Sequence, residues 1–361
     1  MNRKFKFRWL VFLFTGFFLL FYFSCKKGEE QEAYSQEQYG TFQSMDRALQ
    51  QPENVVSLEL RNLEGSDSLK GISKLVNLKN LYIYESKAVT ELPQEIGQCT
   101  NLQAIYLIGT GVSELPSSIG DLTTLQQLSI DSSPLKGLPE SVTNLSNLDK
   151  LGLTSCNLTG VPEILVEMKN LTSLSLNHNP IGSVPDFIEK CTNLQELYLG
   201  SIKLVEVNPK IGSLTNLNVL NLVGNRLIDL PKELSALPNL RKLFLDHNQF
   251  TDLPAHISEL KNLQVLELSN NHFVTIPPVI FSLPLLMELD LISNKITEIP
   301  SDLVKLRNLQ ELSLGYNQIQ KLPSNIAELK SLRKLLLYNN NFTKEEQEKI
   351  QKQLPNVEIQ W

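Results

Sequence analysis

The sequence predicts an α/β solenoid, a horseshoe with a parallel β-sheet on its concave side, short helices or turns on its convex side, and a cap at both ends. The first observation is a period: leucines recur every 23 residues from Val55 almost to the C-terminus, with one early step of 24 and a last step of 22. The second is the recurring motif L-x-x-L-x-L-x-x-N-x-L-x-x-L-P, which is clear from Leu309 to Pro323. A unit this short cannot bury its apolar face alone, so neighbouring units must stack.

The framework is typical of leucine-rich repeats, and each unit opens on a strand. In residues 312–314 the order Leu-Ser-Leu sends two leucines to one side and the residue between them to the other. Successive strands then stack in parallel into a curved sheet. On the return path Pro323 can open a helical turn. The residues expected to point inward from this turn are Ile326, Leu329 and Leu332.

An asparagine column follows the strands. An asparagine side chain carries both a donor and an acceptor, so stacked asparagines can satisfy the buried backbone of neighbouring turns. The column consists of Asn179, Asn225, Asn248, Asn271, Asn294, Asn317 and Asn340. Other residues stand at the equivalent place in four units, namely Thr110, Ser133, Cys156 and Ile202. We therefore expect the N-terminal half to be less regular and less stable.

Both ends of a solenoid expose core unless they are capped. Thr41 to Leu49 predicts an N-terminal cap helix with Thr41 as its N-cap and an apolar stripe. That stripe is Phe42, Met45, Ala48 and Leu49. At the other end Thr343 and Glu346 form a capping box for a helix that runs to about Gln353. A last strand follows with Leu354, Val357 and Ile359.

The N-terminus predicts export. Residues 1–8 hold four basic residues and no acid, and residues 9–24 are apolar apart from Thr15, Gly16 and Ser24. About 16 residues are short for a membrane span, which needs roughly 20. Cys25 directly follows, which resembles the lipobox of bacterial lipoproteins and implies lipidation of Cys25. Tyr22 and Phe23 depart from that motif, so a retained signal anchor and ordinary cleavage are the alternatives.

The expected organisation is a signal peptide (1–24), a flexible tether (25–40), an N-terminal cap helix (41–53), leucine-rich repeats (54–340), and a C-terminal cap helix with the last strand (341–361). Removal of residues 1–24 takes away four basic groups and moves the formal charge from −6 to −10. Such an acidic chain lacks the basic stripe that phosphate backbones require, so we expect no nucleic-acid partner.

Cysteine and histidine spacing argues against disulfides and metal. Cys99 and Cys191 lie four units apart, about 19 Å at one strand spacing per unit, beyond disulfide reach. Cys156 stands in the asparagine column, and all three are expected to be buried free thiols. His178 and His247 lie roughly 14 Å apart by the same measure, too far to share an ion. The other two histidines, His256 and His272, are expected to be ordinary surface residues, and we expect no metal and no cofactor.

Acidic residues line up on three adjacent strands, namely Glu267, Glu288, Asp290 and Glu311. Paired carboxyls can do acid and base chemistry when a shielded pocket shifts their pKa values. We expect an open concave sheet to supply no such shelter, and therefore predict that the chain is not an enzyme.

The places free to vary within the framework are the third, fifth, seventh and eighth of each unit, which line the concave face. Tyr82, Tyr84, Tyr106 and Ile108 predict an exposed apolar patch there. A second stretch holds Tyr198, Val223, Phe244 and Val265, followed by the acids Asp246, Glu267 and Asp290. Aromatic clusters offer rigid contact area and tend to anchor interfaces. The alternative is that these aromatics only cover their strand neighbours.

The chain resembles bacterial leucine-rich repeat lipoproteins of the kind found in spirochaetes. The shared segment L-P-x-x-I-G-x-L-x-N-L matches closely at residues 92–102 and 115–125 and, with Val207-Asn208 replacing Leu-Pro, continues over residues 210–217. The resemblance covers about residues 41–361, including segments like that family's caps at residues 48–58 and 342–359. It implies an interaction module at the bacterial cell envelope, on the outer membrane or the periplasmic face.

Two functions follow as expectations. The first is an exported, lipid-anchored monomer that touches the membrane only through its lipid and binds a protein or another envelope or host macromolecule through its concave face. The second is a cytoplasmic signalling scaffold of the Ras-group leucine-rich repeat type, against which residues 1–25 argue. The sequence identifies neither the ligand nor the membrane leaflet.

Overall fold

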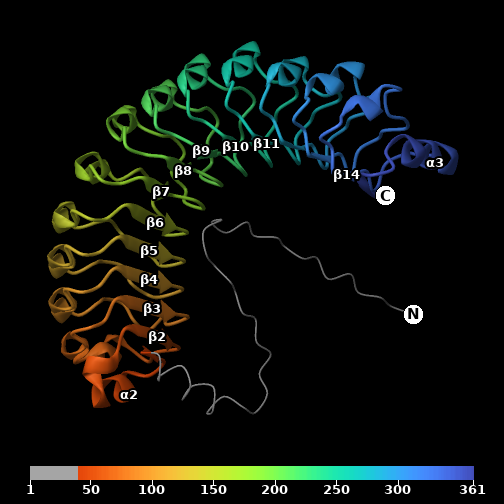
Figure 1. Ribbon diagram of the computed structural model, residues 1–361. Coiled ribbons are helices and arrows are strands. Elements are labelled where there is room, and N and C mark those ends of the chain that lie inside the picture. The colour runs from red at the N-terminus through yellow and green to blue at the C-terminus, as the bar shows by residue number, and fades with distance from the viewer. Residues whose placement is uncertain (1–39) are drawn as a thin grey trace, which may run out of the picture.

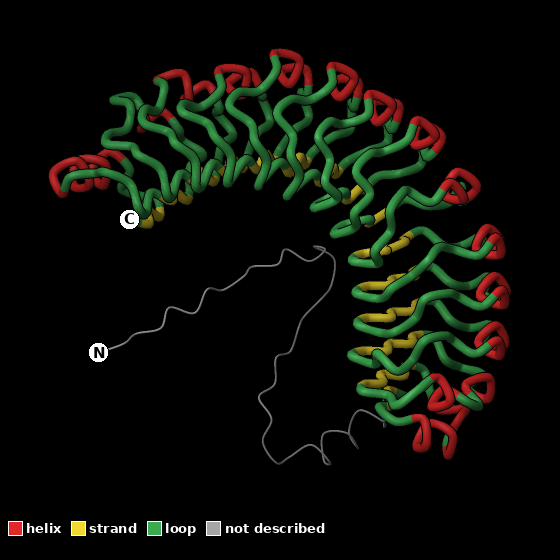
Figure 2. The backbone as a smooth tube through the Cα atoms, turned by 180° about the vertical axis from the view of Figure 1, so that it is seen from behind, coloured by secondary structure: helices red, strands yellow, loops and turns green. Residues whose placement is uncertain are grey.

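The computed structural model describes residues 40–361, which form one arc (Figure 1). Fifteen parallel strands make a single sheet in which every strand lies beside its neighbours in sequence. The sheet lines the inner side of the arc and the helices lie outside it (Figure 2). The predicted α/β solenoid is confirmed. The expected signal peptide, Cys25 and most of the expected tether lie outside the described residues.

Strand length changes twice along the array. The first is a short edge strand, β1 (Thr41–Phe42). Five-residue strands follow, β2 (Ser57–Arg61), β3 (Asn80–Tyr84), β4 (Ala104–Ile108), β5 (Gln127–Asp131) and β6 (Lys150–Thr154). The remaining strands have three residues each, β7 (Ser173–Ser175), β8 (Glu196–Tyr198), β9 (Val219–Asn221), β10 (Lys242–Phe244), β11 (Val265–Glu267), β12 (Glu288–Asp290), β13 (Glu311–Ser313), β14 (Lys334–Leu336) and β15 (Glu358–Gln360).

Short 3-10 helices form the convex side, and α-helices occur only near the ends of the described chain. The α-helices are α2 (Met45–Gln50) and α3 (Lys344–Gln353). The 3-10 helices are η1 (Pro52–Asn54), η2 (Ser66–Leu69), η3 (Ile72–Lys74), η4 (Gln94–Gln98), η5 (Ser117–Asp121), η6 (Glu140–Asn144), η7 (Glu163–Glu167), η8 (Asp186–Lys190), η9 (Pro209–Ser213), η10 (Lys232–Ala236), η11 (Ala255–Glu259), η12 (Pro278–Ser282), η13 (Ser301–Lys305) and η14 (Ile326–Glu328).

The core is one continuous cluster of framework side chains from Phe42 to Leu354. Leu312 and Leu314 are fully buried, as the alternation in the strand predicts. The three inward positions of the return path, Ile326, Leu329 and Leu332, are buried as well. The leucine framework therefore fixes which face of every unit is core, and leaves the remaining side chains free for the concave face, the flanks and the convex side.

The asparagine column ties neighbouring units together through the backbone. Asn271 is typical: its Oδ1 accepts from the N–H of Phe250 at 3.0 Å, and its Nδ2 donates to the carbonyls of Leu245 and Leu268, both at 3.0 Å. Every asparagine of the column makes such bonds, and Asn340, at its C-terminal end, is only half-buried. The predicted role of the column is confirmed.

The strands β2–β6 of the N-terminal half are longer than those that follow, and the lower stability expected of this half stays a prediction. The strands β4, β5 and β6, whose units carry Thr110, Ser133 and Cys156, have five residues, whereas the strands of all asparagine units have three, as does β8 in the unit of Ile202. In the asparagine units the leucine carbonyl at the end of the strand accepts from side-chain amides, as the Leu314 carbonyl does from Asn317 and Asn340. Hydroxyls bridge units instead where Thr110 and Ser133 stand, 2.8 Å apart. Figure 1 shows that β2–β6 stack almost straight and that the curvature is concentrated beyond them.

A second column lies just before the asparagines, where the backbone turns left-handed in every unit. The φ angles run from 51° at Asn62 to 69° at Gly224, and only Gly109 and Gly224 in this column are glycines. Bulky residues such as Tyr316 also adopt this conformation, with φ 54°. Because this region is unfavourable for L-residues with side chains, the stacking of units must hold the turn.

The N-terminal cap starts later than expected. Thr41 is not a helix N-cap: it belongs to β1, which pairs in parallel with β2. The helix α2 begins at Met45 after Ser44, because the chain first adds an edge strand to the sheet. Phe42, Met45 and Ala48 are buried as expected. Gly40, expected to end the tether, is buried too, and its carbonyl accepts from the N–H groups of Val56 and Ser57.

The helix of the C-terminal cap agrees with the prediction, but the last strand is shorter than expected: β15 contains Ile359, whereas Leu354 and Val357 lie in the turn that follows α3. The hydroxyl of Thr343 accepts from the N–H of Glu346 at 3.2 Å, and α3 ends at Gln353. The last strand, β15, pairs in parallel with β14. Within residues 40–361, no helix has the length and apolar character needed to cross a membrane.

Candidate interaction surface

Three rows of side chains run across the concave face, one each from the third, fifth and seventh places of the units. Strand register sets the rows, because each strand pairs with the next without a slip, as Tyr82 with Tyr106 and Tyr106 with Ser129. The fifth-place row is Glu59, Tyr82, Tyr106, Ser129, Gly152, Ser175, Tyr198, Asn221, Phe244, Glu267, Asp290, Ser313, Leu336 and Gln360. The residues between the rows are core.

The predicted aromatic patch is brought together on β3 and β4. The rings of Tyr82 and Tyr106 stack with centroids 4.7 Å apart and planes 8° from parallel. Tyr84 lies on the other side of Tyr82, at 6.0 Å, and pairs in register with Ile108. All four side chains are half-buried. The rings therefore support one another and still leave part of each ring for a partner.

The tyrosine hydroxyls stay protonated over the physiological range. Burial raises the pKa of Tyr84 and of Tyr106 to about 12, and the negative charge of Glu59 adds to the shift at Tyr84. Burial also raises the pKa of Tyr82. These hydroxyls can therefore donate as well as accept hydrogen bonds to a partner.

Arg61 also belongs to this patch and was not among the residues predicted from the sequence. Its guanidinium lies 4.3 Å from the centroid of the Tyr84 ring, a cation–π arrangement. Arg61 holds the seventh place of the unit before Tyr84, and the two residues pair across β2 and β3. The rule that selected Tyr84 would have found Arg61 if it had been applied to the first unit. We call Arg61, Tyr82, Tyr84, Tyr106 and Ile108 the tyrosine patch.

The second predicted stretch is less continuous. Tyr198 and Phe244 are both half-buried, but Asn221 of β9 stands between them in the row. Val223, at a seventh place, is half-buried. Val265 is buried, contrary to expectation, because its short side chain lies in register between the longer side chains of Lys242 and Glu288. Tyr198 and Phe244 thus form two separate contact points.

A stretch of small side chains separates the tyrosine patch from Tyr198. The fifth-place residues there are Ser129, Gly152 and Ser175, all small. A Cβ on Gly152 would come within 2.9 Å of the Ser129 Oγ, so the closeness of that hydroxyl favours glycine. A partner that contacts both aromatic regions must therefore span this stretch of small side chains.

The acids expected on the concave surface are more enclosed than predicted. Asp246 is buried, 8% exposed, because its Oδ1 turns to accept from the N–H of Ser269 at 2.8 Å. Asp290 accepts from the Ser269 hydroxyl at 2.6 Å and from the N–H of Ile292 at 2.8 Å. Glu267 is half-buried and hydrogen-bonded to Asp246. We call Asp246, Glu267 and Asp290 the carboxyl cluster.

The carboxyl cluster corrects the expectation that this sheet leaves carboxyl groups unshielded. Burial raises the pKa of Glu267 well above its usual range, and the nearby charge of Asp246 adds to the shift. Burial also raises the pKa values of Asp246 and Asp290. The bond between Glu267 and Asp246 is best described as a carboxylic acid that donates to a carboxylate. The cluster carries less negative charge at neutral pH than its composition indicates.

The cysteines and histidines of the described chain form neither a disulfide nor a metal site. Cys99, Cys156 and Cys191 are free; the first two are buried as expected, and Cys191 is only half-buried. Burial raises the pKa of Cys99 and of Cys156 to about 12, so these thiols are poor nucleophiles. Among residues 40–361, no group of three histidine, cysteine, aspartate or glutamate side chains is placed to hold a metal ion.

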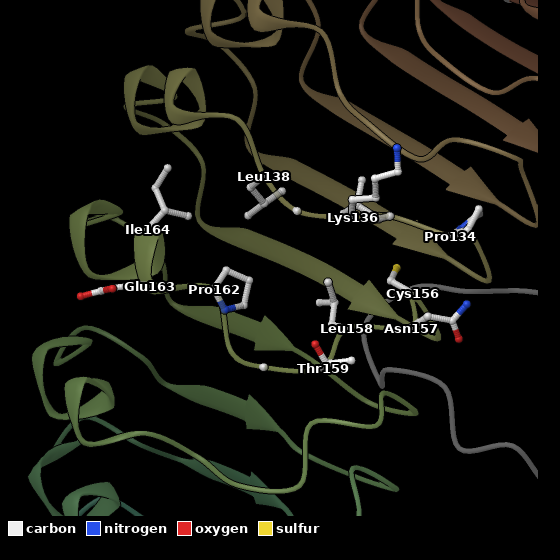
Figure 3. A pocket seen from close by; sticks show the side chains of 13 residues that line it. Pro134, Lys136, Leu138, Cys156, Asn157, Leu158, Thr159, Pro162, Glu163 and Ile164 are labelled. Atoms are coloured by element: carbon white, nitrogen blue, oxygen red, sulfur yellow. The ribbon is translucent and has the colours of Figure 1, made fainter.

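A pocket of about 470 Å³ opens on the flank between two return segments, away from the concave rows (Figure 3). Its lining includes Leu138 of one unit and Leu158 and Pro162 of the next. Other units are joined here by backbone bonds, such as the N–H of Arg226 to the carbonyl of Leu204 at 2.8 Å. Between the two segments of the pocket, both within the described chain, no such bond forms. The pocket therefore marks a loose junction in the stack.

Comparisons with known proteins agree with this architecture. A family model described as "Leucine-rich repeat region" matches residues 51–134 and 228–357. Two further repeat models match residues 192–250 and 169–210. No curated protein matches the chain.

Solved structures share the repeat fold over most of this chain. A leucine-rich repeat protein of Leptospira interrogans is 29% identical with a TM-score of 0.71, over 89% of this chain and 99% of that one. An internalin of Listeria monocytogenes, 21% identical with a TM-score of 0.68 over 86% of this chain and 88% of that one, shares the fold. A plant receptor kinase ectodomain of Arabidopsis thaliana, GASSHO1/SCHENGEN3, was solved in complex with CASPARIAN STRIP INTEGRITY FACTOR 2. It is 25% identical with a TM-score of 0.54, over 84% of this chain and 44% of that one.

Proposed function

The chain belongs to the leucine-rich repeat family, and on that premise we propose that it is an exported, lipid-anchored protein that binds another macromolecule through its concave face. The observation that carries the binding role is the tyrosine patch. Three tyrosine rings and an arginine gather on adjacent strands of an open face, and each ring is half-buried. Rigid aromatic and arginine side chains are the residue types that dominate binding energy at interfaces.

The tyrosine patch suits a protein partner. Its rings are fixed by stacking before any partner arrives, so little side-chain entropy is lost on binding. The hydroxyls remain protonated, and Arg61 adds a planar donor for a carboxylate or a carbonyl. The similar plant receptor ectodomain was solved in complex with CASPARIAN STRIP INTEGRITY FACTOR 2, which supports a binding role for the repeats here.

The carboxyl cluster would bias the choice of partner toward a basic one. A cationic side chain placed at Glu267 must displace the proton that Glu267 holds at neutral pH, because its pKa is raised. Binding of a basic partner should therefore tighten as pH rises and should weaken at higher salt. An affinity that changes with neither pH nor salt would contradict this part of the proposal and leave the tyrosine patch untouched.

Pull-down with the full chain, followed by affinity measurement on the captured partner, tests the concave-face proposal. The variants are Tyr84→Ala with Tyr106→Ala, and separately Tyr198→Ala with Phe244→Ala. We expect the first pair to lower affinity at least tenfold, since loss of hot-spot aromatics costs about 2 kcal/mol or more. Lys330→Ala on the exposed convex side is the control. If the control weakens binding and both aromatic pairs leave it unchanged, the partner binds elsewhere.

Lipidation is tested at Cys25, which lies outside the described residues. The thioether bond to a lipid needs this sulfur, so Cys25→Ala should abolish palmitate labelling and move the protein out of the membrane fraction or leave it as precursor. Cys191→Ala is the matched control and should label normally. Wild-type protein that stays unlabelled in the cytoplasmic fraction would favour the cytoplasmic scaffold instead. The proposal assigns the chain a binding role rather than a catalytic one.

A further inference from the structure

The most exposed apolar side chains of residues 40–361 lie together on one flank of the arc. Ile228, Val205 and Val274 are 67%, 60% and 59% exposed, more than any other large apolar side chain in that part of the chain. Each of them stands three residues after the asparagine-column position of its unit and directly follows a buried side chain. Thr251 and Thr297 hold this place in the intervening and following units and are exposed. Five consecutive units thus carry an exposed column of β-branched side chains.

Backbone hydrogen bonds hold this column as a short parallel ladder. The N–H of Arg226 donates to the carbonyl of Leu204 at 2.8 Å, and the N–H of His272 to that of Phe250 at 2.8 Å. The alternation of the ladder buries Leu227 and Phe273 and turns their neighbours outward. The apolar column is therefore a fixed surface and not a mobile loop.

Two columns of opposite net charge flank the apolar one, with Lys203, Arg226 and Lys295 in the basic column and four carboxylates in the acidic column. On the side nearer the concave face stand Lys203, Arg226, Gln249, His272 and Lys295, all exposed. On the side nearer the convex face stand Glu206, Asp229, Asp252, Thr275 and Glu298, also exposed. Outside these five units the equivalent places change character: Pro180 and Gly182 precede them, and Gln318 and Gln320 follow. We call the three columns the flank stripe.

The flank stripe is complementary to itself in one orientation. If a second copy is turned by 180° about an axis parallel to the columns, its basic column faces the acidic column of the first copy, and the apolar columns meet. A two-fold axis across the columns would instead oppose like charges. Self-complementary patches of this kind form two-fold dimers, in which the same surface serves both partners. We propose that the flank stripe is the interface of a homodimer.

Geometry limits the size and strength of this dimer. The 180° rotation that matches the charges also points the two concave faces in opposite directions. The two curved molecules therefore contact each other only over a short part of their flanks. Five units span roughly 24 Å at one strand spacing per unit. The surface area that such a contact buries lies at or below the lower end for specific interfaces, about 1,200 Å² in total. The dimer should therefore form and dissociate reversibly in about the micromolar range, and both concave faces stay open.

Sedimentation equilibrium of the full chain in density-matched detergent tests the proposal, with circular dichroism to check that each variant folds. Wild-type protein should move from monomer to dimer as its concentration rises through the micromolar range. Ile228→Glu should remain monomeric, because it opposes two buried carboxylates across the axis. Val76→Glu, at another exposed valine, should behave as wild type. A wild-type chain that stays monomeric, or a dimer that Ile228→Glu leaves intact, overturns the proposal.

A charge exchange within one unit tests the orientation. Lys295→Glu alone opposes like charges twice across the axis and should weaken the dimer about tenfold. Addition of Glu298→Lys exchanges the two columns locally and should restore affinity to within about threefold of wild type. The same exchange at the exposed convex pair Lys305 and Asp302 should change nothing. Failure of the double variant to recover would rule out the proposed two-fold arrangement.

Discussion

Asn271→Ala removes one member of the asparagine column and leaves its backbone partners buried. The side chain is 4% exposed. Replacement leaves the N–H of Phe250 without its acceptor and the carbonyls of Leu245 and Leu268 without one of their donors. A net hydrogen bond contributes about 1 kcal/mol, and stranded buried groups add to the loss, so we expect roughly 3–5 kcal/mol of destabilisation.

The preceding unit supplies a matched control. Asn262 is exposed, and its Nδ2 donates to the carbonyl of Pro238 at 2.7 Å. Asn262→Ala deletes the same atoms and one exposed bond, and should cost about 1 kcal/mol or less. Asn271→Asp should cost at least as much as Asn271→Ala, because its carboxylate can accept from Phe250 but sets an oxygen and a buried charge against the carbonyls of Leu245 and Leu268.

Urea unfolding followed by circular dichroism compares the variants, and hydrogen exchange shows where the loss falls. Repeat arrays propagate stability between neighbours, so exchange should rise first at the Phe250 amide and in the adjoining units. If Asn271→Ala destabilises no more than Asn262→Ala, or if its exchange rises evenly along the whole array, the column does not hold the units as described.

Three further predictions concern the core, the turns and the carboxyl cluster. Leu266→Ala should cost about 2–5 kcal/mol in urea unfolding, because Leu266 is fully buried; a cost below about 1 kcal/mol would mean the register is wrong. Ser293, with φ 55°, should accept glycine readily, and Ser293→Val should be less stable than Ser293→Gly by about 1 kcal/mol or more. Because the pKa of Glu267 is raised on folding, the folded state holds the extra proton and stability falls as pH rises above the ordinary carboxyl range. Glu267→Gln should flatten this fall between about pH 5 and pH 9, and an unchanged slope would place the proton elsewhere.

Most of this fold can be predicted from the sequence because the same leucine framework recurs in every unit. Leu312 and Leu314 are assigned to the core by alternation, and the same rule applied to each unit sets the register of the sheet. The N-terminal cap was placed wrongly because it occurs once: Thr41 satisfies the residue preference of an N-cap, yet pairing with β2 gives the chain a strand there instead.

The residues of the concave face were predicted correctly by position but not by environment. Because Tyr82 and Tyr106 hold the same position in adjacent repeat units, they were expected side by side, as the structure shows. It could not show that Asp246 turns toward the N–H of Ser269 and becomes buried, because that depends on the path of the neighbouring turn. The raised pKa values of the carboxyl cluster follow from the same enclosure, which no residue pattern records.

The two outer strands bear on how copies of this protein stay separate during folding. An open sheet with exposed edges can template a further strand from another molecule and so begin a fibre. Here β1 has only two residues, and β15 exposes Glu358 and Gln360. Without residues 341–361 the edge would be β14, where Leu335, Leu336 and Leu337 run together. The C-terminal cap thus guards against aggregation, and a chain cut at residue 340 should form thioflavin-positive aggregates that the intact chain does not.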